Sequence, residues 1–281
     1  MANRVLMLTH TDLDGLSCVV IARLFRLPIT WFKTRDYPEL FDMNGELSVH
    51  GTFDFVYVTD LNVSREMIDS LNKKANDYLI FDHHLGSKEF HDGERVFVDT
   101  EKSGTELLFD YLSKGKRTPH LWKEYATIVS AYDLWKTDHP KRGVAEDLNR
   151  VYFRMLNFKK DQSDFTRYQK FLTVQLRKLQ QGQARAFYFT DYEQERIQEA
   201  KRKEEDEYQK ALQTLQKRYD EKGYAFGIYK GKSKVSYVCN RILTDNPDLY
   251  YVVNVNTWPD GVSGKLSVRS RDDFDVTSLQ P

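Results

Sequence analysis

The stretch Tyr78-Leu79-Ile80-Phe81-Asp82-His83-His84 sets the fold expected for this chain. Four apolar residues, typical of a buried strand, run directly into one carboxylate and two imidazoles. The same design occurs where Val5-Leu6-Met7-Leu8 leads into His10-Thr11-Asp12-Leu13-Asp14-Gly15, and where Phe55-Val56-Tyr57-Val58 ends in Thr59-Asp60. Ligands of open parallel sheets bind outside the carboxyl ends of the strands, so these strand ends predict one shared site.

The N-terminal half of the chain alternates strand signals with helix signals. Strands are expected at residues 5–8, 29–32, 55–58, 78–81 and 96–98. Helices are expected at residues 16–25, 64–74, 103–112 and 121–131. Ser64 and Ser103 are the expected N-caps of the second and third helices, because their hydroxyls can accept a backbone N–H. This alternation predicts an α/β fold whose parallel sheet is covered by helices on both faces.

Three segments of different character are expected along the chain. Residues 1–141 form the strand-and-helix domain, and residues 142–222 form a helical insert or connector with a long helix from Tyr192 to Tyr219. Strand signals return in residues 223–281, at 224–229, 250–255 and 265–269, with a helix at 235–243. The last segment is therefore predicted to be a small α+β domain.

The bulk composition excludes several classes of protein. The 281 residues are 40% hydrophobic and 30% charged with zero formal net charge, which indicates a globular chain without bulk attraction to long nucleic acid. Cys18 and Cys239 are the only cysteines, so neither a disulfide framework nor a thiolate zinc site is expected. No signal-peptide pattern and no apolar run of about 18 residues occurs, so we expect a cytoplasmic protein without a membrane partner.

Carboxylates and imidazoles gather at the predicted strand ends and at the end of the helix over 121–131. They are His10, Asp12, Asp14, Asp60, Asp82, His83, His84 and Asp133. Such ligands suit Mn²⁺, with Mg²⁺, Fe²⁺, Co²⁺ or Zn²⁺ as alternatives, and their number suits two ions about 3.5–4 Å apart that share a carboxylate. Taken singly, a strand-end Asp is usually a cap and Asp-x-Asp-Gly can be a turn. The metal hypothesis rests on their conjunction.

This ordered set of motifs resembles the DHH phosphoesterase superfamily, which includes RecJ-type exonucleases, nanoRNases, cyclic-dinucleotide phosphodiesterases and family II pyrophosphatases. The resemblance covers residues 1–135, including the run Ser103-Gly104-Thr105-Glu106 after the third motif. The short His10-x-Asp12 spacing is similar to the Asn-Asp-Leu-Asp-Gly form of a second, Bacillus-like nanoRNase group and differs from the pyrophosphatase pattern. The resemblance implies phosphodiester hydrolysis by water activated between two Mn²⁺ ions, with Mg²⁺ or Co²⁺ as substitutes.

The resemblance also implies a role for each residue of the set. Three residues would hold one ion: His10, Asp12 and Asp60. Four would hold the second: Asp14, Asp60, His83 and Asp133. As catalytic residues, His84 would face the scissile phosphate and Asp82 would fix the orientation of the imidazoles.

The resemblance implies that the C-terminal segment is a DHH-associated domain that binds substrate. Arg269 or Arg271 would bind a phosphate through the guanidinium fork, and Asn240 lies in a helix that resembles a substrate-facing one. The family's Gly-Gly-Gly-His motif would follow Asp275-Val276-Thr277, and the sequence ends at Pro281 before it. We therefore expect a domain that looks truncated, either because this version has lost the motif or because the sequence is cut there.

The leading functional hypothesis is a manganese-dependent phosphodiesterase that trims short oligonucleotides to mononucleotides. Zero net charge and the absence of a long basic run favour a small substrate. Three alternatives stay open: a phosphodiesterase for cyclic or linear dinucleotides, a RecJ-like exonuclease for single strands, and a nucleotide-binding module without catalysis. A homodimer is also left open.

Overall fold

A computed structural model describes residues 4–35, 52–156, 164–181, 189–257, 264–271 and 274. The chain forms two compact units, Met1–Glu193 and Gln194–Pro281. The boundary between them lies inside residues 142–222, the segment predicted to be a connector, and the three-domain division stays a prediction. Among the described residues, no helix is both long enough and apolar enough to cross a bilayer.

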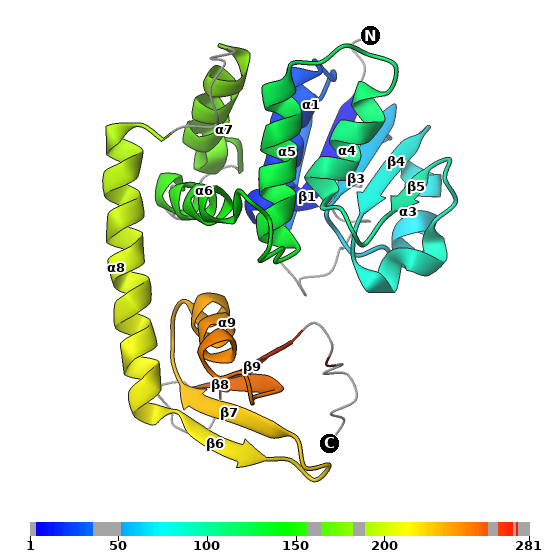
Figure 1. Ribbon diagram of the computed structural model, residues 1–281. Coiled ribbons are helices and arrows are strands. Elements are labelled where there is room, and N and C mark those ends of the chain that lie inside the picture. Colours follow the sequence, from blue (N-terminus) through cyan, green and yellow to red (C-terminus); the bar gives the residue numbers. More distant parts are fainter. Residues whose placement is uncertain are drawn as a thin grey trace. The chain divides into compact units, whose positions relative to one another are not determined.

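The first unit is built on a parallel sheet of five strands in the order β2-β1-β3-β4-β5 (Figure 1). The strands are β1 (Val5–His10), β2 (Trp31–Arg35), β3 (Phe55–Thr59), β4 (Tyr78–Asp82) and β5 (Val96–Val98). All four neighbouring pairs are parallel. From β1 the chain continues to β2 on one side, whereas β3 lies on the other side, so the strand order switches direction between β1 and β3. At such a switch point the carboxyl ends of the strands leave room for a ligand.

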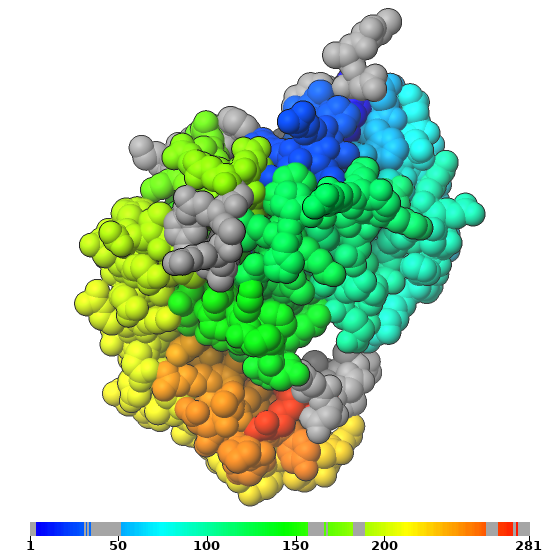
Figure 2. Space-filling model, turned by 45° about the horizontal axis from the view of Figure 1, so that its top comes forward, coloured from blue at the N-terminus to red at the C-terminus, as the bar shows by residue number. Residues whose placement is uncertain are grey.

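Helices cover both faces of this sheet, which confirms the predicted α/β class. They are α1 (Leu13–Leu24), α3 (Arg65–Lys74), α4 (Gly104–Ser113) and α5 (His120–Asp133). On one face, Met67 and Leu71 of α3 share a core with strand residues such as Val58. On the opposite face, α1, α4 and α5 pack together, and the ring of Tyr111 on α4 lies 5.1 Å from that of Phe81. In Figure 2 the green residues of α4 and α5 spread over the middle of the first unit.

The predicted N-caps are confirmed, and one helix begins earlier than expected. The Ser64 and Ser103 hydroxyls accept from the backbone N–H groups of Met67 and Glu106. Helix α1 begins at Leu13, not at residue 16, because Asp12 caps it. A short helix of the 3₁₀ type, η1 (Leu85–Phe90), follows the Asp82-His83-His84 triplet.

Among the described residues, two further helices belong to the first unit, and a third begins in it. Helix α6 (Arg142–Met155) packs against α5, and α7 (Asp164–Gln180) packs against α1 and β2. Helix α8 (Asp191–Thr214) begins in the first unit, where Lys178 Nζ lies 2.7 Å from the buried Glu193 carboxylate. This buried ion pair fixes the start of α8 to α7.

Among the described residues, the second unit has a four-stranded sheet on which a helix and the end of α8 pack. Its strands are β6 (Gln216–Tyr219), β7 (Ala225–Lys230), β8 (Tyr251–Thr257) and β9 (Gly264–Ser270), in that order, with α9 (Val235–Asp245) between β7 and β8. Val238 and Ile242 of α9 share a core with Val252 of β8. The predicted small α+β domain is confirmed in its strand and helix content. Residues 275–281, which hold the Asp275-Val276-Thr277 run, lie outside the described residues.

One secondary-structure prediction is wrong. The long helix expected to reach Tyr219 ends at Thr214, and residues 216–219 form β6. Gln216 pairs with Ile228 and Tyr219 with Ala225 in an antiparallel ladder with β7. Hydrogen bonding to a neighbouring strand overrides a helical pattern, and this pairing has no signal in the local sequence.

Candidate metal centre

The carboxyl ends of three neighbouring strands and the end of one helix bring the predicted ligands together. His10 ends β1, Asp60 follows β3, His83 follows β4 and Asp133 ends α5. Ligand atoms within 4.8 Å of one another form one group from His10, Asp12 and Asp60, a second from Asp14, Asp60, His83 and Asp133, and a third from Asp60, His83 and His84. Asp60 belongs to all three groups, so they lie side by side.

The first group is shaped by the turn from β1 into α1. His10 Nδ1 lies 2.9 Å from Asp12 Oδ2 and 3.7 Å from Asp60 Oδ2. Asp12 also accepts a hydrogen bond of 3.0 Å from the backbone N–H of Gly15. A Cβ at position 15 would lie 2.2 Å from the His10 carbonyl oxygen, so only glycine allows this tight turn. Burial acts to raise the pKa of Asp12, and contacts with His10 and Gly15 outweigh it and lower the pKa to about 2.

The second group is anchored by the N-terminus of α4. The backbone N–H groups of Gly104 and Thr105 donate to the two carboxylate oxygens of Asp14 at 2.8 and 3.0 Å. His83 Nε2 lies 3.1 Å from Asp60 Oδ1 and 3.1 Å from Asp133 Oδ2. The sequence suggested the Ser103–Glu106 run as a family feature, and the structure shows that its backbone holds Asp14.

Asp60 is the most constrained residue of the centre. It is 2% exposed and has a φ of 53°, a left-handed conformation that Asp visits more readily than most residues. A Cβ at Gly104 would lie 3.0 Å from the Asp60 Cβ, so the start of α4 approaches closely. Left-handed backbone at a non-glycine residue costs about 1–3 kcal/mol, and such strain concentrates at functional sites.

The electrostatics of the centre fit divalent cations. Burial first, and neighbouring carboxylates second, raise the pKa of both Asp60 and Asp133 well above the usual range. One carboxylate oxygen of each, Oδ2, is buried without a hydrogen-bond partner among the described residues. Several buried carboxylates this close to one another are unfavourable unless a positive charge compensates them. Carboxylate and imidazole donors in this arrangement could therefore hold metal ions.

His84 is oriented by a relay that the sequence only partly revealed. His84 Nδ1 lies 2.7 Å from Oδ1 of the fully buried Asp82. Asp82 Oδ2 in turn accepts a hydrogen bond from the Ser87 hydroxyl, whose oxygen also lies 2.8 Å from Asn62 Oδ1. Burial alone would lower the pKa of His84. The hydrogen bond to Asp82 and its negative charge outweigh the effect of burial, so the pKa of His84 is raised. Ser87 was missed because a serine after such a triplet carries no signal without the fold.

The predicted substrate residues of the second unit differ in how the fold uses them. Arg271 donates from Nε to the Leu249 carbonyl at 2.8 Å, and from Nη2 to the Leu243 carbonyl at 2.5 Å and the Asn246 carbonyl at 3.1 Å. Its guanidinium thus fixes the end of α9. Arg269 donates from Nη2 to Ser236 Oγ at 3.3 Å on the surface.

Asn240 lies half-buried on α9, and its backbone carbonyl accepts from the Thr244 hydroxyl at 2.9 Å. The substrate role of Asn240 and of both arginines stays a prediction.

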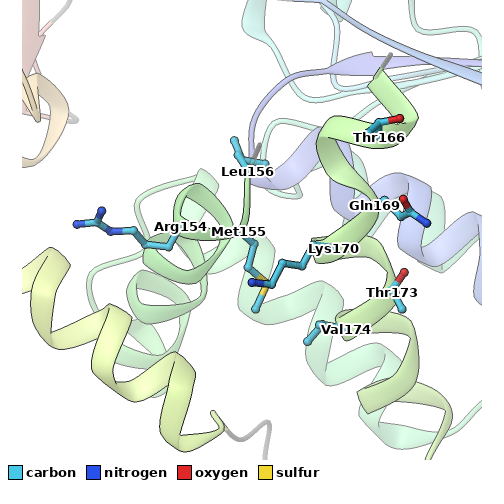
Figure 3. Close-up of a pocket in the computed structure, with 8 residues that line it drawn as sticks. All are labelled: Arg154, Met155, Leu156, Thr166, Gln169, Lys170, Thr173 and Val174. Carbon is cyan, nitrogen blue, oxygen red and sulfur yellow. The ribbon is translucent and has the colours of Figure 1, made fainter. Parts of the chain in front are cut away.

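A separate cavity of about 580 Å³ lies between α6 and α7 (Figure 3). Its lining residues are Arg154, Met155, Leu156, Thr166, Gln169, Lys170, Thr173 and Val174. None of the predicted ligands lines it, so it does not belong to the metal centre.

Comparisons with known proteins agree with the motifs. No family model matches the chain. The oligoribonuclease NrnB of Bacillus subtilis is 23% identical over 290 residues, which are 96% of this chain and 67% of NrnB. A 3′,5′-cyclic-nucleotide phosphodiesterase of Helicobacter pylori is 23% identical over 314 residues, covering 97% of this chain and 86% of that protein.

Two solved structures share the fold. A pGpG-specific phosphodiesterase from Vibrio cholerae has a TM-score of 0.59 and 12% identity, over 95% of this chain and 83% of that one. The DHH domain of a protein assigned to a family of ribosomal proteins has a TM-score of 0.59 and 12% identity, over 96% of this chain and 74% of that one. The motif order, the parallel sheet and these relatives together support the assignment of the chain to the DHH phosphoesterase superfamily.

Proposed function

We propose that this chain is a metal-dependent phosphodiesterase that hydrolyses short oligonucleotides to mononucleotides. The observation that carries the proposal is Asp60, a buried and strained carboxylate shared by two adjoining groups of ligand atoms. The relative named oligoribonuclease supports the substrate class. The zero net charge of the chain also favours a small substrate over a long polynucleotide.

The two groups would each hold one divalent ion. The first ion would bind His10, Asp12 and Asp60, and the second would bind Asp14, Asp60, His83 and Asp133. Mn²⁺ suits this mixture of carboxylate and imidazole ligands, with Mg²⁺ or Co²⁺ as alternatives. Bound ions of this kind lower the pKa of water and neutralise charge on a phosphate.

Residues of the chain outside the two ligand groups would stabilise the phosphate and bind the rest of the substrate. Asp82 and Ser87 fix the ring of His84, and the raised pKa favours its imidazolium form. An oriented imidazolium stabilises the negative charge that develops on the phosphate during hydrolysis. In the second unit, Arg269 and Asn240 are our candidates for contact with the rest of the substrate.

A second candidate function is hydrolysis of cyclic or linear dinucleotides. It is favoured by the relative named 3′,5′-cyclic-nucleotide phosphodiesterase. The same two ligand groups would serve, because only the remote end of the substrate differs. A homodimeric state stays a prediction, as does a cytoplasmic location, with which two free and buried cysteines are consistent.

The direct test is hydrolysis of 5′-labelled ribonucleotides two to seven residues long, in Mn²⁺, Mg²⁺, Co²⁺ or EDTA. We expect mononucleotides from these substrates with a divalent ion and none in EDTA. Cyclic dinucleotides and long single strands are included as competing substrates. Hydrolysis of cyclic dinucleotides alone would establish the second candidate, and no hydrolysis with any ion would refute both.

A further inference from the structure

Helix α5 ends in an unusual way at the ligand Asp133. The N–H of Trp135 donates to the Tyr132 carbonyl at 3.1 Å, and the N–H of Lys136 donates to the Ala131 carbonyl at 3.0 Å. Trp135 takes the left-handed position, with a φ of 52°, that glycine normally occupies at a helix end. The last turn of α5, which carries Asp133, therefore adopts a conformation that its own sequence does not favour.

A side chain from the next helix holds this turn in place. Arg142, in the first turn of α6, donates from Nη1 to the carbonyls of Ala131 at 2.7 Å and Tyr132 at 3.3 Å. Its guanidinium carbon lies 3.9 Å from the centre of the Trp135 ring and 5.4 Å from that of Tyr132. One guanidinium thus adds a second donor to two carbonyls of the helix end and stacks on Trp135, the residue that makes the turn.

The contacts of Arg142 are specific to arginine. Glu146 Oε1 accepts from Nε at 3.0 Å, which fixes the plane of the guanidinium from the α6 side. A lysine lacks the planar fork that can donate along its edges to these groups while its face stacks on a ring. Arg142 Nη2 is buried without a hydrogen-bond partner among the described residues, an arrangement that is poor for stability alone.

We propose that Arg142 is a positioning residue for the second ligand group. It fixes the end of α5 so that Asp133 Oδ2 stays 3.1 Å from His83 Nε2. Asp60 and His83 follow strands of one sheet and Asp14 lies in the first turn of α1, close after β1, whereas Asp133 reaches the group from the last turn of α5. Its distance from the others therefore depends on how that helix end is held. The inference rests on the proposed metal centre.

The test compares Mn²⁺ binding in wild type, Arg142→Met, Arg142→Lys and Arg154→Met. The last variant makes the same substitution on the same helix, away from α5. Titration followed by electron paramagnetic resonance of free Mn²⁺ gives the number of bound ions and their affinities. We expect Arg142→Met to lower the affinity for one of the two Mn²⁺ ions by about 10- to 100-fold. Loss of a residue that orients a metal ligand has an effect of this size. Arg142→Lys should lie between, and Arg154→Met should match wild type.

A double-mutant cycle with Asp133→Asn separates positioning from general stability. If Arg142 acts through Asp133, Arg142→Met should weaken binding no further once Asp133 is asparagine. Equal weakening in both backgrounds, or wild-type affinities in Arg142→Met, would overturn the inference. If Arg142→Met does not fold, Arg142→Lys is used in the same cycle.

Wild type that binds two ions without hydrolysing any nucleotide would refute the proposed function and leave this inference standing. Wild type that binds no second ion would refute the metal centre and the role of Arg142 together.

Discussion

The two units use charged residues near strand ends in opposite ways. In the second unit, Arg271 follows β9 and directs its guanidinium to three backbone carbonyls. In the first unit, Asp60 and Asp133 each keep a buried oxygen without a hydrogen bond among the described residues. The charge of Arg271 is satisfied by the protein itself, which indicates a structural role. The crowded carboxylates around Asp60 and Asp133 indicate instead a site for a positively charged ligand.

The largest effect is expected from Asp60→Asn, which removes the shared ligand while keeping its shape. We expect turnover to fall by at least about a thousand-fold, because both ions lose a ligand and metal stabilisation is worth several kcal/mol. The free energy of unfolding of the metal-free chain should stay the same or rise, since one of several buried carboxylates crowded together is removed.

Asp69→Asn, on the exposed side of α3, is the matched control for Asp60→Asn. It should change neither turnover nor metal content. If Asp60→Asn keeps half of the wild-type turnover, Asp60 cannot be the shared ligand.

His84→Gln should have the next largest effect, and on turnover alone. Loss of one group that stabilises developing charge lowers kcat by about 10²- to 10³-fold. Ion binding should persist, because His84 lies outside both proposed ligand sets. Ser87→Ala should lower kcat less, since Asp82 still orients the ring. Loss of bound Mn²⁺ in His84→Gln would instead make His84 a metal ligand.

The two arginines of the second unit provide a direct comparison of structural and substrate roles. Arg271→Met should lower the free energy of unfolding by about 1.5–3 kcal/mol, the usual worth of hydrogen bonds to a charged group. Arg269 lies on the surface, so Arg269→Met should change the free energy of unfolding by less than about 0.5 kcal/mol. It should raise KM, because Arg269 is the proposed substrate contact. Chemical denaturation and steady-state kinetics on both variants check this. The reverse assignment would move the substrate contact to Arg271.

The smallest effect is a pH dependence of the metal-free chain. Burial raises the pKa of Asp60 and Asp133 in the folded state, so between the unfolded value of about 3.9 and the folded value the folded chain binds more protons. Stability should therefore fall as pH rises through this window. The raised pKa values of Asp14 and His84 act in the same direction, whereas burial lowers the pKa of His83 and opposes them. Thermal unfolding from pH 5 to 8 should show this fall without metal, and Mn²⁺ should remove it.

Much of the fold and of the metal centre could be predicted from the sequence, because strand ends are local signals. Each apolar run leads into a proposed ligand, and parallel strands place their carboxyl ends at one edge, so His10, Asp60 and His83 were expected together. The Asp12 to Gly15 turn and the serine caps follow from neighbouring residues in the same way.

The rest depends on contacts between residues far apart in the chain. The backbone N–H groups of Gly104 and Thr105 donate to Asp14 from 90 and 91 residues away, and no local sequence pattern predicts that contact. Residues 216–219 continue a helical pattern in the sequence, and only their pairing with β7 shows that they form a strand. The hydrogen bond from Arg142 to the end of α5 depends on how α5 and α6 pack together. Arg271 resembles a phosphate ligand in sequence, and only the fold shows the three carbonyls that it binds.

The most direct test of the account is an anomalous difference map from crystals of the chain soaked in Mn²⁺. We predict two peaks about 3.5–4 Å apart on either side of Asp60. One should lie beside His10 and Asp12, and the other beside Asp14, His83 and Asp133. A single peak, or peaks that Asp60 does not join, would contradict the account.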